Sequence, residues 1–273
     1  MSVNRYDGSI EGFICAVDGC LKRGDGNPEF VRDGDRSGAG LFEADIREIA
    51  TVRETAMAFR ELFVKKVSRE AFATARYAFH SQKSGIEQLV WRYFKLGMEI
   101  GQRLPGMLAD EPVYSVHRIA RHVSHEAHKF KGFVRFREVA EGFLYARIEP
   151  EADILPLIAP HFVNRVGDRP WIIHDSGRNQ AAVFDLASWR LIRDIELTAE
   201  PHLSAREHIF TDLWQRYFQR HAITERHNPA LQQKHVPLRY RKHLPEFESR
   251  SDCSPAASGT STNEDTCGQF TDN

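Results

Sequence analysis

Apolar residues recur with two different periods along the chain, and the change of period separates a helical part from a part that contains strands. Between residues 51 and 104 they recur every three or four positions, which predicts helices packed on one side. The clearest stripe consists of Ile86, Leu89, Val90, Tyr93, Phe94 and Gly97. Thr51 and Ser84, each followed by a glutamate three residues later, are typical of helix N-caps. We therefore expect residues 1–112 to be mostly helical, with a Gly- and Asp-rich loop at 22–40.

Residues 113–247 follow a different plan, in which short runs of alternating polarity precede helical stretches. Four such runs are predicted to form two successive β-hairpins: residues 128–138, 143–149, 171–175 and 181–185. A helix is expected after each hairpin, one capped by Asp153 and one by Ser204. Two hairpin–helix units can build a four-stranded antiparallel sheet with both helices on one face, so the sequence predicts an α+β fold. Trp214, in the apolar stripe of the last helix, is expected in the core.

The first predicted hairpin has two chemically different faces. One is apolar and suits a buried core; it carries Val134, Phe136, Leu144, Ala146 and Ile148. The other interleaves aromatic rings with cations, preceded by Lys129: Lys131, Phe133, Arg135, Arg137, Phe143, Tyr145 and Arg147. Rings that stack on bases, beside cations that hold phosphates, are typical of surfaces that bind single-stranded nucleic acid. The alternative is that helices cover this face, with the arginines paired to carboxylates and their stems packed on the rings.

Composition limits the class of protein. With 41% hydrophobic and 27% charged residues, the 273-residue chain has an ordinary globular composition. It contains no apolar run long enough to cross a bilayer and no signal-peptide pattern, so we expect a cytoplasmic protein that does not act at a membrane. The 4 cysteines form no Cys-x-x-Cys pair, and we expect reduced thiols without a disulfide framework or an iron–sulfur or zinc site.

The net charge of −1 is unevenly distributed along the chain. Residues 248–273 contain five carboxylates and one arginine, so this segment carries −4 and the rest of the chain about +3. The segment is acidic and poor in apolar residues, and it is expected to be a disordered tail. The stretch before it is basic, and there we expect contacts with phosphates from Arg239, Tyr240, Arg241 and Lys242. The alternative is that these cations pair with acids from elsewhere in the fold.

No motif in the sequence assigns a reaction. A phosphate-binding P-loop, a Gly-x-Ser-x-Gly elbow and the signature of a zinc deaminase are all missing from the sequence. His122, His125 and His128 recur at steps of three, which spreads them around a helix, so neither a metal nor a cofactor is expected.

Four residues remain as weak candidates for acid–base catalysis: Glu126, His128, His174 and Asp175. His174 and Asp175 are adjacent on a predicted strand and should point to opposite faces, so they would not act as a couple. Structural roles are favoured for all four, and whether the protein is an enzyme stays open.

Several stretches of the sequence together resemble one bacterial family. These are Tyr6-Asp7-Gly8-Ser9-x-Glu11-Gly12, residues 126–136, residues 155–162, and Asn228-Pro229-x-Leu231-Gln232-x-x-His235-Val236-Pro237-x-Arg239-Tyr240. The chain is similar, over nearly all of residues 1–247, to a DNA repair, or DNA metabolism, family that accompanies a radical-SAM protein. In some members this domain is joined to a uracil-DNA glycosylase-like domain. The loop near residues 22–40 is longer than is usual for the family, and the tail after Glu248 belongs to this chain alone.

The resemblance implies a setting and partners but no catalytic residues. The setting is DNA repair or DNA metabolism, and the implied partners are DNA, a radical-SAM protein and a uracil-DNA glycosylase-like protein. Our first hypothesis is a protein that binds nucleic acid and works with the radical-SAM partner. Two alternatives stay open, namely an enzyme that itself acts on damaged or modified bases and an adaptor that binds only proteins.

Overall fold

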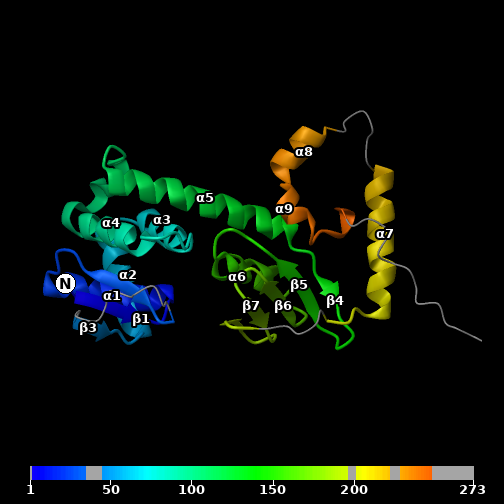
Figure 1. The fold of residues 1–273 in the computed structure, drawn as a ribbon, viewed down its shortest axis with the longest axis horizontal. Coiled ribbons are helices and arrows are strands. Elements are labelled where there is room, and N and C mark those ends of the chain that lie inside the picture. The colour runs from blue at the N-terminus through cyan, green and yellow to red at the C-terminus, as the bar shows by residue number, and fades with distance from the viewer. Residues whose placement is uncertain (1, 35–44, 196–200, 222–227, 248–273) are drawn as a thin grey trace, which may run out of the picture.

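The computed structural model describes residues 2–34, 45–195, 201–221 and 228–247, which form two lobes joined by one long helix, α5 (Glu111–Phe133) (Figure 1). The buried hydrophobic residues form two clusters, one in each lobe, and α5 belongs to both. It contributes Val113, Val116 and Ala120 to the first and Val123, Ala127 and Phe130 to the second. The expected boundary at residue 112 therefore lies in the first turn of a helix that the two lobes share.

The N-terminal lobe contains a small parallel sheet. Its central strand is β1 (Ser2–Tyr6), and β2 (Glu29–Arg32) and β3 (Asp45–Glu48) lie on either side. The strand is central because helix α1 (Ile10–Arg23) connects it to β2, which runs parallel to β1 on one side, and β3 pairs with the other side.

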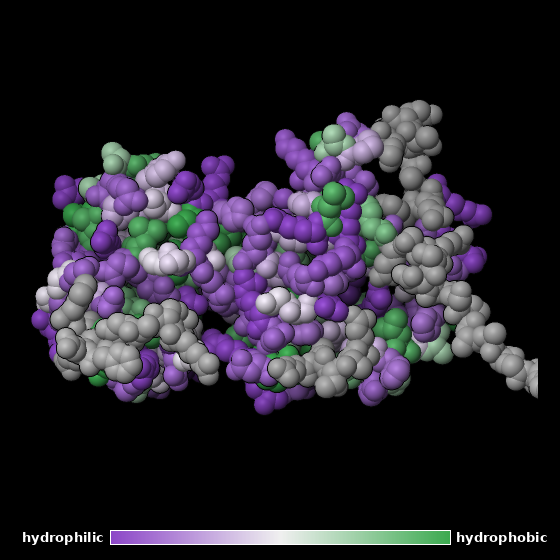
Figure 2. Space-filling model, in the orientation of Figure 1, coloured by the Kyte–Doolittle hydropathy of each residue, from purple (hydrophilic) through white to green (hydrophobic). Residues whose placement is uncertain are grey.

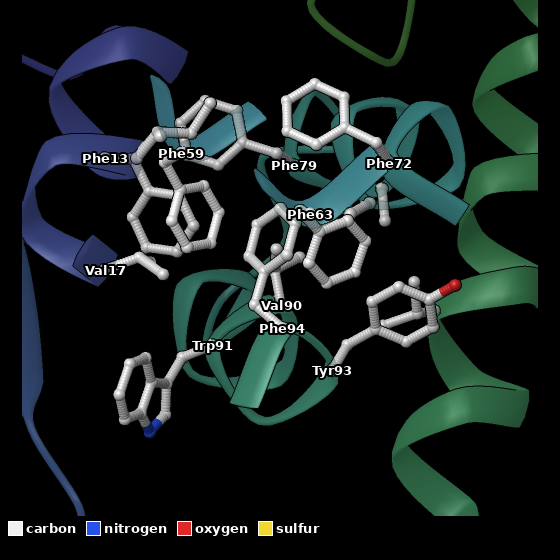
Figure 3. Close-up of a cluster of buried hydrophobic side chains, with 14 of the residues drawn as sticks. Phe13, Val17, Phe59, Phe63, Phe72, Phe79, Val90, Trp91, Tyr93 and Phe94 are labelled. Carbon is white, nitrogen blue, oxygen red and sulfur yellow. The ribbon is translucent and has the colours of Figure 1, made fainter. Parts of the chain in front are cut away.

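Three helices complete this lobe around a core of aromatic rings: α2 (Arg53–Lys66), α3 (Arg69–Phe79) and α4 (Ile86–Ile100). Figure 3 shows these rings, among which Phe63 and Phe94 meet edge to face with centroids 5.0 Å apart. The predicted stripe of α4 faces this core. At Gly97 an added Cβ would lie 2.7 Å from the Phe63 ring, so close packing requires a glycine there. The 3-10 helix η2 (Gly101–Gly106) follows α4.

The polar residues expected to cap α2 and α4 are used differently. Thr51 hydrogen-bonds the Asp7 carboxylate, and neither Thr51 nor Ser84 caps its helix. Glu87, three residues after Ser84, accepts a hydrogen bond of 3.1 Å from the Tyr6 hydroxyl. Both capping predictions are therefore wrong, because β1 and the turn after it compete for the same side chains.

The second lobe is built on a five-stranded mixed sheet. Its strands lie in the order β4 (Arg137–Glu138), β5 (Leu144–Ile148), β6 (Trp171–Asp175), β7 (Gln180–Phe184) and β8 (Trp189–Ile192). The α+β class and the hairpins β4–β5 and β6–β7 are confirmed. The four-stranded antiparallel sheet is wrong, because α6 (Leu155–Arg165) connects β5 and β6 as a crossover, so these strands run parallel.

The first strand of the predicted central hairpin is mostly helical. Helix α5 continues through Phe133, and only Arg137 and Glu138 pair with β5. Ala127, Phe130 and Val134 are all buried at steps of three and four, so the helical period continues through the region taken for a strand. Three residues assigned to the hairpin or its approach therefore lie on α5: Lys129, Lys131 and Phe133.

One face of the sheet is covered by α6 and the C-terminal half of α5. Ile158 and Phe162 of α6 belong to one buried cluster with Trp171 and Ile173 of β6. The apolar face predicted for the first hairpin lies on this side, since Ala146 and Ile148 are only 1% and 3% exposed.

The C-terminal elements lie at the edge of the sheet and beside α5. They are α7 (Ala205–His221), α8 (Pro229–His235), α9 (Leu238–Arg241) and the 3-10 helix η4 (Pro245–Phe247). The prediction that the last long helix packs on the sheet, with Trp214 in the core, is wrong. Trp214 is 41% exposed, because α7 touches the protein mainly at β4 and η4. The predicted disordered tail at 248–273 lies outside the described residues.

The surface shown in Figure 2 is largely hydrophilic over the described residues. Within this described part, no helix is both long and apolar enough to cross a membrane.

Candidate functional site

Strand register brings four side chains to the second face of the sheet, opposite α6. Arg137 pairs with Tyr145 across β4 and β5, and Arg147 pairs with His174 across β5 and β6. Paired residues project from the same face, as do residues two apart on one strand, so these four share one surface. The predicted basic and aromatic face is therefore present over β4 and β5, although it is shorter than expected.

A small cavity of about 130 Å³ lies on this face, and we call it the basic pocket. It is lined by Arg135, Arg137, Tyr145, Arg147, Pro201, Leu203, Lys242 and His243. Two irregular segments wall it in, one before α7 and one after α9. The first is fixed by the bridge between Val139 and Leu203. The face is therefore neither fully open nor covered by a helix, and cations from separate segments converge on it.

Two described carboxylates pair with these cations. Arg135 donates a hydrogen bond of 2.8 Å to Glu246. Glu149 pairs with Lys242 and lies 3.2 Å from the ring Nε2 of His243. Burial raises the pKa of Glu149, but hydrogen bonds from Lys242, Ser176 and His243 outweigh burial and leave that pKa below its usual value. Glu149 is therefore a stable anion that ties the C-terminal segment to the sheet.

The lining of the pocket is rich in basic side chains. It contains Arg135, Arg137, Arg147 and Lys242, and among the described residues Glu246 pairs with Arg135 and Glu149 pairs with Lys242 and Arg147. Arg147 is oriented by a hydrogen bond of 3.0 Å from its Nε to the Ser176 hydroxyl. Such an arrangement suits an anionic oxygen group, for which guanidinium forks are the preferred protein partner.

Tyr145 forms a wall of the pocket and is held by His174. Its hydroxyl lies 2.8 Å from Nδ1 of His174, in a contact that is buried. Burial, with Arg147 as a second cause, lowers the pKa of His174, so this imidazole is neutral at physiological pH. Nε2 of His174 is also buried and has no hydrogen-bond partner among the described residues. Nδ1 of a neutral His174 can accept a hydrogen bond from the Tyr145 hydroxyl, and this contact orients the phenol at the wall of the pocket.

The other catalytic candidates from the sequence do not converge on the pocket. Asp175 lies on the opposite face from His174, as expected for neighbours on a strand, and forms an ion pair of 3.1 Å with Arg178. Burial raises the pKa of Asp175, and Arg178 limits that rise. His128 is exposed on α5. These positions indicate a structural role for Asp175 and a surface position for His128.

Glu126 has an architectural role. Its two carboxylate oxygens accept hydrogen bonds from the backbone N–H groups of Glu151 and Ala152, at 2.8 and 2.9 Å. It also accepts a hydrogen bond from the Tyr240 hydroxyl. The carboxylate is 5% exposed and fully engaged, so it holds the loop after β5 and the C-terminal segment against α5.

The basic C-terminal residues find partners far away in the sequence. Arg239 pairs with Glu151, and Lys242 pairs with Glu149. Arg241 donates to the backbone oxygen of Val236 at 3.0 Å and lies over the Phe247 ring. Tyr240 is buried against Phe130. For Arg239 and Lys242 the structure thus agrees with the alternative that these cations pair with acids from elsewhere in the fold. Of these four C-terminal residues, Lys242 lines the basic pocket.

The aromatic rings expected to stack on bases are not available for stacking. Phe133 packs against Tyr240, with centroids 5.9 Å apart, and Tyr145 is 8% exposed. Phe143 is half-buried just before β5. The site therefore offers charge and hydrogen bonds and does not offer an aromatic platform.

Several lining residues were not found from the sequence. His243 and Glu149 meet across 94 positions, and neither stands in a motif. Pro201 and Leu203 lie in a connecting segment without periodic pattern. The only signal in the sequence was the basic composition near residue 242, which does not indicate which acids or strands it faces.

Comparison with known proteins gives a family but no activity. No curated protein and no solved structure matches the chain. One family model does match, over residues 84–246, which span α4, α5, the whole second sheet and the C-terminal helices. This match covers more than half of the sequence, and the chain therefore belongs to the DUF4130 family, a domain of unknown function.

Proposed function

We propose that this protein binds nucleic acid and that the basic pocket receives a phosphate of the strand. One observation carries the proposal: four cationic side chains from separate segments meet around a cavity of about 130 Å³. A ligand with several anionic oxygens can accept hydrogen bonds from more than one guanidinium or ammonium group at once. A phosphate group has such oxygens.

A second basic surface favours a long anionic ligand over a small one. Along its exposed side, α5 carries a row of basic residues spaced three and four apart: Arg118, Arg121, His122, His125 and His128. The ion pairs of Glu151 with His122 and with Arg239 connect this row to the C-terminal segment. A nucleic-acid strand has phosphates at regular intervals and can use several such positions.

The proposed setting is the one that the family resemblance implies. In that setting the protein acts in DNA repair or DNA metabolism beside a radical-SAM protein and presents the strand to it. A uracil-DNA glycosylase-like protein is a further proposed partner. The geometry of the basic pocket suits this role because it supplies charge and leaves bases unstacked, so a partner could read or modify them.

The test is salt-dependent binding of a labelled single-stranded DNA of about 12 nucleotides, a length within the usual range of single-strand sites. The variant Arg147→Gln with Lys242→Gln should bind more weakly. Its plot of log affinity against log salt should be flatter by about 0.7 for each phosphate that the variant no longer neutralises. The matched control is Arg190→Gln on β8, which removes an exposed cation outside the pocket. Affinity and slope that are equal in parent, double variant and control would refute the proposal.

A catalytic role is the second candidate, and the contact between Tyr145 and His174 favours it. In that role the phenol of Tyr145, which lines the pocket, lies beside the bound strand and His174 orients it. Incubating the isolated protein with oligonucleotides that contain damaged bases tests this alternative, with Tyr145→Phe as the comparison. Turnover that disappears in Tyr145→Phe while DNA binding persists would favour the enzyme.

A further inference from the structure

A cavity of about 890 Å³ in the N-terminal lobe is lined by residues of α1, α2 and α3 and of the turns before α1 and α2. Four arginines line it, Arg53 and Arg60 on α2 and Arg69 and Arg76 on α3, and we call it the arginine groove. It lies outside residues 84–246, the part that the family model matches, and it shares no residue with the basic pocket.

The arginines form two rows. Each pair is separated by seven residues, which is about two helical turns or roughly 10 Å along the helix axis. Both members of a pair therefore lie on the same side of their helix. A short turn at Val67 and Ser68 joins α2 and α3. Arg69 directly follows this turn, Arg60 lies midway along α2, and Arg53 and Arg76 lie further from the turn.

These four side chains have no carboxylate partner within the described part of the chain. All four are exposed, and among the described residues only Arg76 places its guanidinium against another side chain, the Tyr77 ring at 5.7 Å. The cations of the other lobe differ, since Arg135, Arg178, Arg239 and Lys242 each have a carboxylate partner. The lining also contains the carboxylates of Asp7 and Glu11, so its four cations outnumber its two acids, which favours an anionic ligand.

Much of the remaining lining is apolar, and we call this part the floor of the groove. It consists of Ile10, Ile14, Ala56, Met57, Val64, Phe72 and Ala73. A volume of about 890 Å³ falls in the range of pockets that take small organic ligands. The ligand should therefore combine a flat or apolar body with at least one anionic group.

One end of the groove carries hydrogen-bonding groups. Burial raises the pKa of Asp7, but hydrogen bonds from Ser9 and Thr51 outweigh it and hold that pKa below its usual value. The Asp7 carboxylate is thus already engaged, whereas Glu11 is exposed at the same end. Glu11 can accept a hydrogen bond from an amine or hydroxyl of a ligand.

We infer that the arginine groove binds a nucleotide unit, with its base on the apolar floor, its phosphate held by the arginines and a donor of its base or sugar directed at Glu11. The unit can be a free nucleotide or one nucleotide of a strand, since both present the same chemistry. This inference does not depend on the proposed role of the basic pocket.

The experiment titrates the full-length protein with three probes: AMP, a labelled tetranucleotide and inorganic phosphate. Saturable binding of AMP or of the tetranucleotide is expected, and the stronger of the two identifies the source of the ligand. The variant Arg60→Gln with Arg69→Gln should bind at least tenfold more weakly, because hydrogen bonds between charged groups are removed. The matched control, Lys65→Gln with Lys66→Gln, changes two exposed cations of the same helix outside the groove and should bind like the parent.

A second variant and a second measurement keep the test independent of folding. Glu11→Gln should weaken nucleotide binding while leaving any phosphate binding unchanged. In the unmodified protein, AMP should slow amide hydrogen exchange at the start of α1 and along α2. The inference is overturned if neither nucleotide probe binds, if the arginine variant binds like the control, or if phosphate alone competes as well as AMP. Nucleotide binding that survives in Arg147→Gln with Lys242→Gln separates this site from the basic pocket.

Discussion

The Tyr240 hydroxyl donates a hydrogen bond of 2.5 Å to the Glu126 carboxylate, joining residues 114 positions apart in the sequence. Burial and then Glu126 raise the pKa of Tyr240 above its ordinary value, so the phenol keeps its proton. Through this contact the C-terminal segment is attached to α5, and with it Lys242 reaches the basic pocket. The sequence suggested Glu126 for acid–base chemistry and Tyr240 for phosphate contacts. In the structure, the two residues instead bind each other and hold the C-terminal segment on α5.

Tyr240→Phe should lower the free energy of unfolding by about 1–3 kcal/mol, because a hydrogen bond to a buried charge is removed. Urea denaturation measures the change. The matched control is Tyr114→Phe, since Tyr114 is 53% exposed on α5 and should be neutral. Equal midpoints for the two variants would show that this contact contributes nothing to stability.

Gly97→Ala should destabilise the N-terminal lobe by about 1–3 kcal/mol, the usual cost of overpacking a core. The new methyl would lie 2.7 Å from the Phe63 ring and 2.9 Å from Leu104. Gly132→Ala is the opposite case, because a Cβ there meets nothing within 4 Å and alanine favours the helix. The melting temperature should therefore be lower for Gly97→Ala than for the parent protein, and it should not be lower for Gly132→Ala.

Stability should fall as the pH drops below about 6.5, the ordinary pKa of histidine. Burial lowers the pKa of His174 and of His117 in the native state. As the pH falls, these histidines bind protons in the unfolded chain before they do so in the native protein. The free energy of unfolding is therefore highest above about pH 6.5 and decreases as the pH falls from there through the lowered pKa of the native histidines. Unfolding measured between pH 8 and pH 5 tests this. His174→Gln should flatten the dependence, whereas the exposed His125→Gln should not.

Trp214→Ala should change stability by less than about 1 kcal/mol, in contrast to the 3–5 kcal/mol typical of a buried tryptophan. The side chain is 41% exposed, and its contacts are Glu246, Arg135 and the stacked Tyr217 ring. Trp171→Ala, at a position with no exposure, should show the full loss. Comparable losses from both substitutions would mean that α7 is packed in solution.

The sequence predicted correctly those elements in which apolar residues recur with one unambiguous period. The stripe from Ile86 to Gly97 and the strands 171–175 and 181–185 appear as expected. Residues 128–138 were misread because Phe130 and Val134, which are four positions apart, fit both a period of two and a period near 3.6. Periodicity could not decide between them, and the buried positions Ala127 and Phe130 show that the helix prevails.

Contacts between segments far apart in the chain could not be predicted from the sequence. The parallel pairing of Leu144 with Trp171 depends on the path of α6 over the sheet, which no local pattern specifies. The same holds for Lys242 and Glu149, which meet only after the C-terminal segment has folded back. Trp214 was placed in the core for a different reason. An amphipathic stripe predicts that one face of a helix is apolar, but it does not show that another part of the chain covers that face.

Helix α5 belongs to both cores of the molecule. Its 23 residues span about 34 Å, and each half of its buried stripe completes a different core. Residues 84–246 alone would leave Phe94 without Phe59 and Phe63 of α2, whose rings meet it edge to face. We therefore expect the segment that the family model matches to be less stable without residues 1–83, because apolar surface of α4 and α5 would be exposed to water.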